Sequence, residues 1–80
     1  MTIAVWLAIV PSVPRHRQSL GKRIRLYRKL NRFTQEKLAE KAELAPSYVS
    51  DVERGQVNIS VDAVQRIAKA LKIRLRDLFE

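Results

Sequence analysis

Two short helices joined by a tight turn are predicted by residues 34–55, TQEKLAEKAELAPSYVSDVERG. Thr34 is a suitable N-cap for the first helix, because its hydroxyl can accept from a free backbone N–H and acidic residues follow in the first turn. Pro46 suits the first position of the second helix, where its missing N–H costs nothing, and Gly55 suits the end. The turn between the helices falls at residues 43–44.

The apolar residues of this stretch predict a steep corner between the two helices. Ala39 is small enough to lie inside the corner, and Leu44 fills the turn from within. Val49 and Val52 then seat the second helix on the first. An exposed helix whose N-terminal end is free has the shape that enters the major groove of B-DNA. The residues that this arrangement leaves pointing outward are Pro46, Ser47, Ser50, Asp51 and Arg54.

The flanking sequence predicts three further helices, which makes an all-α, five-helix domain over residues 20–80 with an N-terminal extension and linker over residues 1–19. The first helix is expected to end near Asn31, a candidate left-handed stop. Ser60 is the expected N-cap of the fourth helix, and a short fifth helix covers about residues 75–79. Apolar residues at helical spacing mark the first and fourth helices: Leu20, Ile24, Tyr27 and Leu30, then Val64, Ile67, Ala68 and Leu71.

Residues 1–14 differ from the rest of the chain. Ile3 to Val10 form one uncharged apolar run, followed by Pro11 and Pro14. The run is too short to span a bilayer as a helix, which needs ~20 residues, and it lacks the positive start of a secretory signal. Three interpretations stay open: a strand that pairs with the same strand of a second subunit, a disordered extension, or sequence upstream of the true start.

Positive charge is concentrated in the first half of the chain, whose net charge is +8. No Asp or Glu precedes Glu36, and the later acids and bases balance. Such a basic block favours a polyanion such as nucleic acid, by attraction to phosphate and release of its counterions, although a solvated helix face is the plainer alternative. The bases of this block are Arg15, Arg17, Lys22, Arg23, Arg25, Arg28, Lys29 and Arg32.

The sequence lacks the residues that catalysis and metal binding need. The chain has no Cys, and His16 is its only His, so neither a catalytic Cys–His or Ser–His–Asp set nor a Cys/His metal site can be assembled. Gly21 and Gly55 are the only glycines, which excludes a glycine-rich phosphate loop. The sequence therefore predicts a protein that is not an enzyme and holds no metal or cofactor.

Four stretches, in this order and at this spacing, resemble the Cro/repressor-type helix-turn-helix family, often called XRE. The resemblance covers about residues 20–79 and implies a five-helix, cytoplasmic transcriptional regulator that binds palindromic operators as a dimer. The short length and the loop from Asn58 to Ser60 also resemble controller proteins of restriction–modification systems. The matching stretches are Gly21-Lys-Arg-Ile-Arg25, Thr34-Gln-Glu-Lys-Leu-Ala39, Ser47-Tyr-Val-Ser-Asp-Val-Glu-Arg-Gly55 and Ile67-Ala-Lys-Ala-Leu71.

The resemblance implies a role for each residue that matches a DNA-contacting position of the family. Gln35 matches a residue that contacts a phosphate and braces the recognition helix, while Ser47 and Asp51 match base readers. Pro46 lies at a third base-reading position, where its ring offers only an apolar contact such as one to a thymine methyl. The other implied contacts are Tyr48 and Ser50 to base or backbone, and Arg54 and Asn58 to the backbone.

Arg28 and Glu53 match a partly buried ion pair between the first and third helices, with Arg28 also near a phosphate. Such a pair adds little stability but can fix relative orientation, so a purely structural role is the alternative. Other implied contacts have plainer interpretations as well. Ser47 is otherwise an ordinary first-turn residue, and Tyr48 otherwise packs on the preceding helix. Asp51 either accepts a hydrogen bond from a cytosine amino group or orients the Arg three residues later.

The sequence departs from the family pattern at several positions. Arg32 and Glu43 stand where the family commonly has Gly, and a left-handed non-Gly residue costs about 1 kcal/mol. Ala45 replaces the usual Ser or Thr cap of the recognition helix, which forfeits ~1 kcal/mol. Leu26 and Leu30 stand where charge is usual, and they are candidate packing sites for the apolar N-terminal run.

The predicted function is sequence-specific transcriptional regulation through double-stranded DNA, carried out by a homodimer. One alternative is an antitoxin-type module that binds its own operator and also a protein partner through residues 1–14, by adding a strand to a sheet edge. A second alternative is a protein-interaction module that has lost DNA binding, for which the unusual tip at residues 45–47 is the sign. A membrane-surface role is disfavoured, because Ile24 and Tyr27 of the basic helix are needed in the core.

Overall fold

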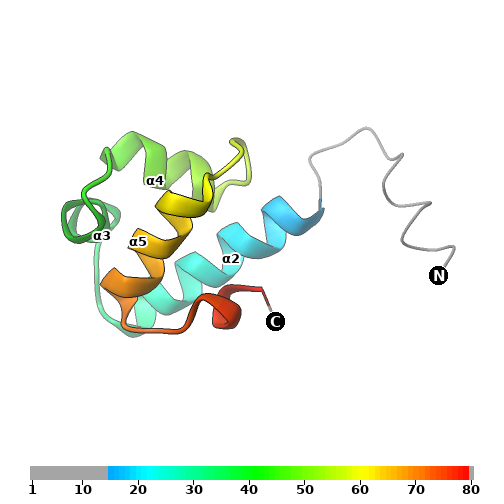
Figure 1. The fold of residues 1–80 in the computed structure, drawn as a ribbon. Coiled ribbons are helices and arrows are strands. Elements are labelled where there is room, and N and C mark those ends of the chain that lie inside the picture. Colours follow the sequence, from blue (N-terminus) through cyan, green and yellow to red (C-terminus); the bar gives the residue numbers. More distant parts are fainter. Residues whose placement is uncertain (1–14, 80) are drawn as a thin grey trace, which may run out of the picture.

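The computed structural model describes residues 15–79, which fold into four α-helices followed by one 3-10 helix (Figure 1). Predictions about residues 1–14, including a strand and a partner-binding role, lie outside the described residues. No strand occurs within residues 15–79, so the all-α class is confirmed for them. The elements are α2 (Arg15–Leu30), α3 (Gln35–Ala42), α4 (Pro46–Glu53), α5 (Val61–Leu71) and η1 (Leu75–Leu78).

The predicted fifth α-helix is wrong, since residues 75–78 form a 3-10 helix. Its hydrogen bonds span three residues: the Asp77 N–H donates to the Arg74 carbonyl and the Phe79 N–H donates to the Arg76 carbonyl, both at 3.0 Å. Four residues are too few to complete the longer hydrogen-bonded turns of an α-helix. The Asp77 carboxylate also accepts from the Arg74 N–H at 2.9 Å, which closes the start of the turn.

Helix α2 begins at Arg15, five residues before the predicted start at Leu20. The polar linker expected over residues 15–19 is therefore wrong, and the predicted division between residues 19 and 20 falls inside the helix. The segment RHRQS contains no Gly or Pro, and Arg and Gln are good helix formers, so nothing in it stops the helix from extending back to the last Pro.

The two polar N-caps are confirmed. The Thr34 hydroxyl accepts from the Lys37 N–H at 3.0 Å, and the Ser60 hydroxyl accepts from the Ala63 N–H at 3.1 Å. The left-handed stop of α2, in contrast, is not Asn31 but the next residue, Arg32, with φ 60°.

The side chain of Asn31 forms two hydrogen bonds at this corner. Its side-chain Nδ2 donates to the Tyr27 carbonyl at 2.9 Å and to the Leu71 carbonyl at 3.4 Å. The amide thereby links the end of α2 to the end of α5. The change of backbone direction falls one residue later, at Arg32.

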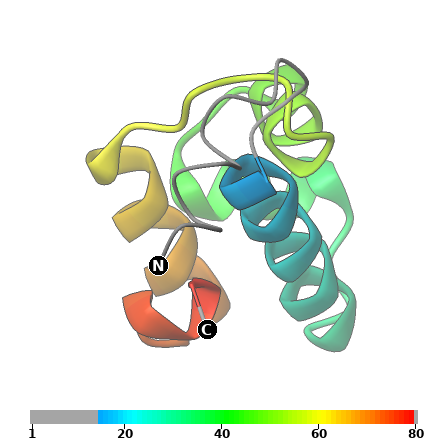
Figure 2. The same cartoon turned by 90° about the vertical axis from the view of Figure 1, so that its right-hand side faces the viewer.

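One core is shared by all the helices. Helices α2 and α5 lie side by side, with α4 above them in both views (Figures 1 and 2), and α3 packs against both α4 and α5. Within residues 15–79, no helix combines the length and the apolar character needed to cross a bilayer. The core cluster comprises Leu20, Ile24, Leu38, Ala39, Ala42, Val49, Val52, Val64, Ile67, Ala68, Leu71 and Leu78.

Gly21 allows α2 to approach the end of α4 closely. A Cβ atom at this position would lie 2.5 Å from the Val52 carbonyl oxygen and 2.6 Å from that of Glu53, closer than real Cβ contacts come. A helical Gly normally costs stability relative to Ala, but here the absence of a side chain is what permits the two backbones to meet. This approach brings the next turns of α2 to the C-terminal end of α4.

Candidate nucleic-acid interface

A left-handed turn at Glu43 directs the chain from α3 into α4. Glu43 has φ 58° and ψ 47°, so this non-Gly residue adopts the left-handed conformation that favours Gly. The Leu44 N–H donates to the Ala39 carbonyl at 2.8 Å, and Leu44 packs against the core. Ala39 is fully buried, so the small residue predicted inside the corner is confirmed.

Helix α4 presents its N-terminal end to solvent. Pro46 is its first residue, as predicted, and Ala45 offers no side-chain cap. Ala45, Pro46 and Ser47 are all exposed. On the opposite side, Val49 and Val52 are buried and hold α4 in the core. The N-terminal end of α4 is therefore exposed, while the opposite side of the helix is packed in the core.

The remaining predicted contact residues of α4 line its outer side to different degrees. Tyr48 is half-buried and packs against the core cluster, and Ser50 is half-buried. Asp51 and Arg54 form an ion pair, with 2.6 Å between Asp51 Oδ1 and Arg54 Nη2. The Arg54 side chain is 58% exposed and that of Asp51 is 38% exposed, so this pair lies at the surface. The carboxylate of Asp51 thus has a partner on its own helix.

A buried polar network joins α2, α3 and α4. Arg28 Nε lies 2.6 Å from Glu53 Oε2, and Arg28 Nη2 donates to Glu53 Oε1 at 3.1 Å. Arg28 Nη1 donates to the Phe33 carbonyl at 2.8 Å. The side chains of Arg28 and Glu53 are only 11% and 3% exposed. This fork geometry satisfies both charges and fixes α4 relative to α2.

Gln35 completes the network, because its Nε2 donates to Glu53 Oε1 at 3.0 Å. The first residue of α3 is therefore tied to the last residue of α4. Sequence reasoning assigned bracing to Gln35 only through a family resemblance and did not identify Glu53 as its partner. The two residues are 18 positions apart, and no helical spacing signals a contact that depends on how α3 crosses α4.

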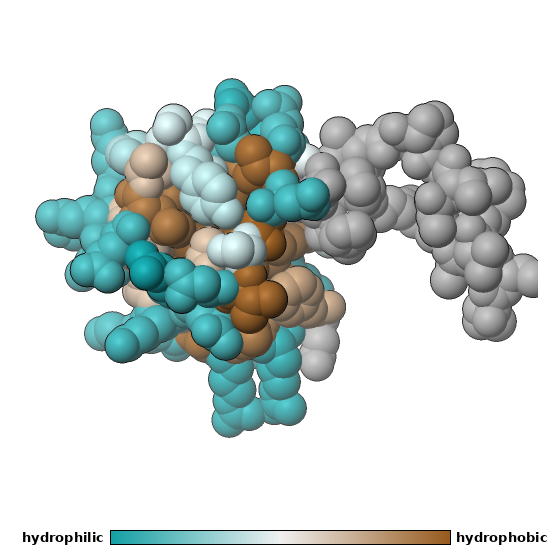
Figure 3. Space-filling view, turned by 45° about the horizontal axis from the view of Figure 1, so that its top comes forward, coloured by the Kyte–Doolittle hydropathy of each residue, from teal (hydrophilic) through white to brown (hydrophobic). Residues whose placement is uncertain are grey.

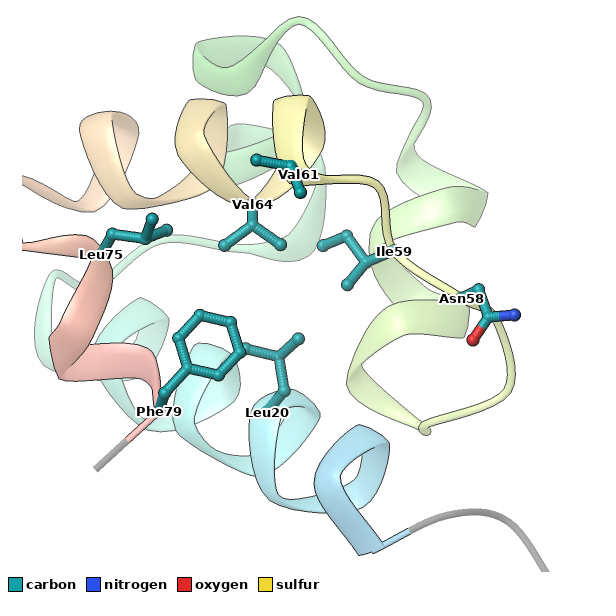
Figure 4. A pocket seen from close by; sticks show the side chains of 7 residues that line it. All are labelled: Leu20, Asn58, Ile59, Val61, Val64, Leu75 and Phe79. Atoms are coloured by element: carbon teal, nitrogen blue, oxygen red, sulfur yellow. The ribbon is translucent and has the colours of Figure 1, made fainter.

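The other predicted contacts lie beyond α4. Asn58 is exposed in the loop that leads to α5, and its side chain points away from the neighbouring apolar residues in Figure 4. In Figure 3, hydrophilic side chains cover much of the displayed face, and apolar side chains are exposed between them. Exposed bases of α2 and the following turn are Lys22, Arg25, Lys29 and Arg32.

The polar groups at the surface of residues 15–79 decide which chemistry it offers. That part of the chain contains no group of three His, Cys, Asp or Glu side chains arranged to hold a metal ion. What the surface offers instead is an exposed helix end, hydroxyl and carboxylate groups beside it, and guanidinium groups around it. These are groups that hydrogen-bond to base edges and phosphates.

A short helix that turns through a tight corner into a second, exposed helix defines the helix-turn-helix class of DNA-binding unit. Residues 24–78 match the family model described as Helix-turn-helix. The chain therefore belongs to the helix-turn-helix family, of the XRE type, and the resemblance noted from its sequence is confirmed.

Relatives with known names agree with this assignment. Control protein C.BamHI of Bacillus amyloliquefaciens is 39% identical over 61 residues, which is 75% of each chain. The immunity repressor protein of Bacillus phage phi105 is 42% identical over 57 residues, covering 71% of this chain and 40% of the repressor. The crystal structure of the restriction-modification controller protein C.AhdI from Aeromonas hydrophila matches with a TM-score of 0.78 and 41% identity, over 79% of this chain and 96% of that chain.

Proposed function

We propose that this chain is a sequence-specific transcriptional regulator that reads a palindromic operator as a dimer, with α4 in the major groove. The observation that carries the proposal is the exposed amino end of α4, held in place by the buried network of Arg28, Gln35 and Glu53. A recognition helix must keep its orientation while its outer side meets the bases, and a network that ties it to two other helices provides this.

The proposed base contacts lie at the start of α4. Ser47 is exposed in the first turn and reads a base edge through its hydroxyl, while the Pro46 ring makes an apolar contact such as one to a thymine methyl. Tyr48 and Ser50 flank these positions. Asp51 reads a base or holds Arg54 for its contact, and both roles are compatible with the 2.6 Å ion pair.

The proposed phosphate contacts surround the helix. Gln35 begins α3, so its backbone N–H points outward at a helix N-terminus that favours a phosphate, while its side-chain amide stays on Glu53. Arg54 and Asn58 contact the sugar-phosphate backbone beyond the end of α4. The exposed bases of α2 add sequence-independent attraction, which falls as salt rises.

Regulators among the relatives support this assignment. C.BamHI is named a control protein and the phage protein an immunity repressor. The matched structure is that of a restriction-modification controller protein. A dimer would place two copies of α4 in successive major grooves, about 34 Å apart on one face of the DNA.

Selection of bound sites from a random DNA pool at low and moderate salt tests the proposal. We expect a palindromic site that survives the rise in salt. Ser47→Ala is expected to relax the preference at one position of each half-site, by about 1–3 kcal/mol per lost base contact. Ser19→Ala, at an exposed position of α2, is the matched control and should leave the selected site unchanged. Unselective binding that disappears with salt would overturn the proposal.

A further inference from the structure

The two ends of α4 are held in different ways. Glu53, its last residue, belongs to the buried polar network that joins α4 to α2 and α3. Val49 and Val52 pack the middle of the helix by apolar contacts, which are not directional. Pro46 and Ser47, the proposed base readers, lie at the other end, about 10 Å from Glu53 along the helix axis. The orientation of this reading end therefore depends on the turn that precedes it.

Glu43 determines how the chain leaves that turn. Its left-handed backbone, with φ 58° and ψ 47°, costs free energy for a residue that has a Cβ. Ala45 adds no side-chain cap to the start of α4, and Pro46 has no N–H to donate. The ψ angle of Glu43 sets the direction of its carbonyl group and of the chain that enters α4. A group that holds this carbonyl therefore holds the corner.

Arg66 of α5 provides such a group. Its Nη1 donates to the Glu43 carbonyl at 3.3 Å, although the two residues are 23 positions apart. The Nε of the same guanidinium lies 3.0 Å from Asp62 Oδ2, four residues earlier on α5. Helix α5 lies beside α3, and below α4 in the view of Figure 1. The carboxylate thus holds one edge of the planar guanidinium while another N–H meets the turn.

We propose that Arg66 is a positioning residue, which fixes the reading end of α4 through the Glu43 carbonyl. The inference rests on the proposed function, because it gives Arg66 a part in how α4 meets the bases. Glu53 anchors one end of α4 and Arg66 anchors the turn before the other end. Two anchored points define the direction of a helix, and groups that read bases must be held within a fraction of an ångström.

Two plainer roles of Arg66 compete with positioning. An exposed Arg can contact a phosphate directly, and its loss then weakens binding to all sequences alike and lowers the salt dependence. The pair with Asp62 can also serve only the stability of α5, by a small amount. Neither role changes the preference for one base over another, so this preference is the quantity to measure.

The test compares Arg66→Gln with the wild type on the selected operator and on duplexes with one base pair changed in each half-site. The discrimination ratio is the affinity for the operator divided by the affinity for a changed duplex, measured by fluorescence anisotropy at several salt concentrations. We expect Arg66→Gln to lower the largest of these ratios about fivefold, as the loss of one hydrogen bond implies. The salt dependence of binding should stay unchanged.

Lys69→Gln is the matched control, because Lys69 is exposed on α5 and lines the same hollow as Glu43 and Arg66. It removes the same charge and should leave the discrimination ratio unchanged. Circular dichroism checks that both variants are folded at the temperature of the titrations.

Three outcomes would overturn the inference alone: unchanged discrimination in Arg66→Gln, an equal loss in Lys69→Gln, or uniformly weaker binding with a lower salt dependence. The last of these would mark Arg66 as a phosphate contact. A wild type without a preferred site would instead overturn the proposed function, and the inference with it.

Discussion

The Asp51 carboxylate lies 2.6 Å from the Arg54 guanidinium on the outer side of α4. An exposed pair at this spacing stabilises a helix by only ~0.3 kcal/mol, so stability alone gives the pair little value. A carboxylate alone would be repelled by phosphates, and pairing removes this cost. If Asp51 acts by orienting Arg54, its effect on DNA binding depends on Arg54.

We therefore predict coupling between these two residues in DNA binding. The loss of affinity caused by Arg54→Ala should be smaller when Asp51→Ala is already present, with a coupling free energy of about 1 kcal/mol. Titration of the selected operator with the wild type, both single variants and the double variant measures it. Additive losses would show that Asp51 acts independently of Arg54, as a base reader would.

Arg28 shows how much one buried charge depends on its partner. Arg28→Met should destabilise the fold by about 3–5 kcal/mol, because Glu53 is then left buried with only the Gln35 amide as a partner. Urea denaturation followed by circular dichroism measures the change. Arg28→Met combined with Glu53→Leu should recover most of the stability, since apolar residues replace both charges. If the double variant is as unstable as the single one, the network itself holds the fold.

At the scale of the element, helix α4 begins without a side-chain cap. Ala45 has the extended backbone of an N-cap, with φ −72° and ψ 140°, so a hydroxyl at this position is already placed to accept from a free N–H of the first turn. Helices α3 and α5 do have side-chain caps, Thr34 and Ser60, and the backbone conformation of both caps is close to that of Ala45.

Ala45→Ser is accordingly predicted to stabilise the protein by about 1 kcal/mol. Thermal unfolding compared with the wild type provides the measurement. Thr34→Ala is the converse control and should cost a similar amount by removing the cap of α3. A Ser at position 45 that brings no gain would mean that water or DNA, not a side chain, satisfies the start of α4.

At the scale of the whole molecule, one apolar core joins the helices of residues 15–79. Among the described residues, the core cluster runs from Leu20 to Leu78 and draws on α2, α3, α4, α5 and η1. Each of these elements packs against at least one other, so we expect them to fold without residues 1–14.

A chain of residues 15–80 should thus fold with helix content close to that of the full chain and unfold in one cooperative transition. Circular dichroism measures the helix content and follows the thermal transition of both chains. A truncated chain that fails to fold would show that residues 1–14 belong to the core.

The helices and the corner could be predicted from the sequence because their signals are local. The Thr34 and Ser60 caps, Pro46 at the start of α4 and the small Ala39 in the corner each act within about one helical turn. Side-chain and backbone preferences at this range depend on a few neighbours, which the sequence displays directly. The outward-facing residues of α4 followed from the same stretch, while the family followed from four such stretches between Gly21 and Leu71.

The ends of the first and last helices were harder to predict, because no local signal marks them: α2 extends back to Arg15, and residues 75–78 form a 3-10 helix. Tertiary contacts decided how the helices pack. The Gly21 approach and the Gln35–Glu53 hydrogen bond join residues that are far apart in sequence. Such contacts depend on the distance and angle between packed helices, which residue spacing along one chain does not contain.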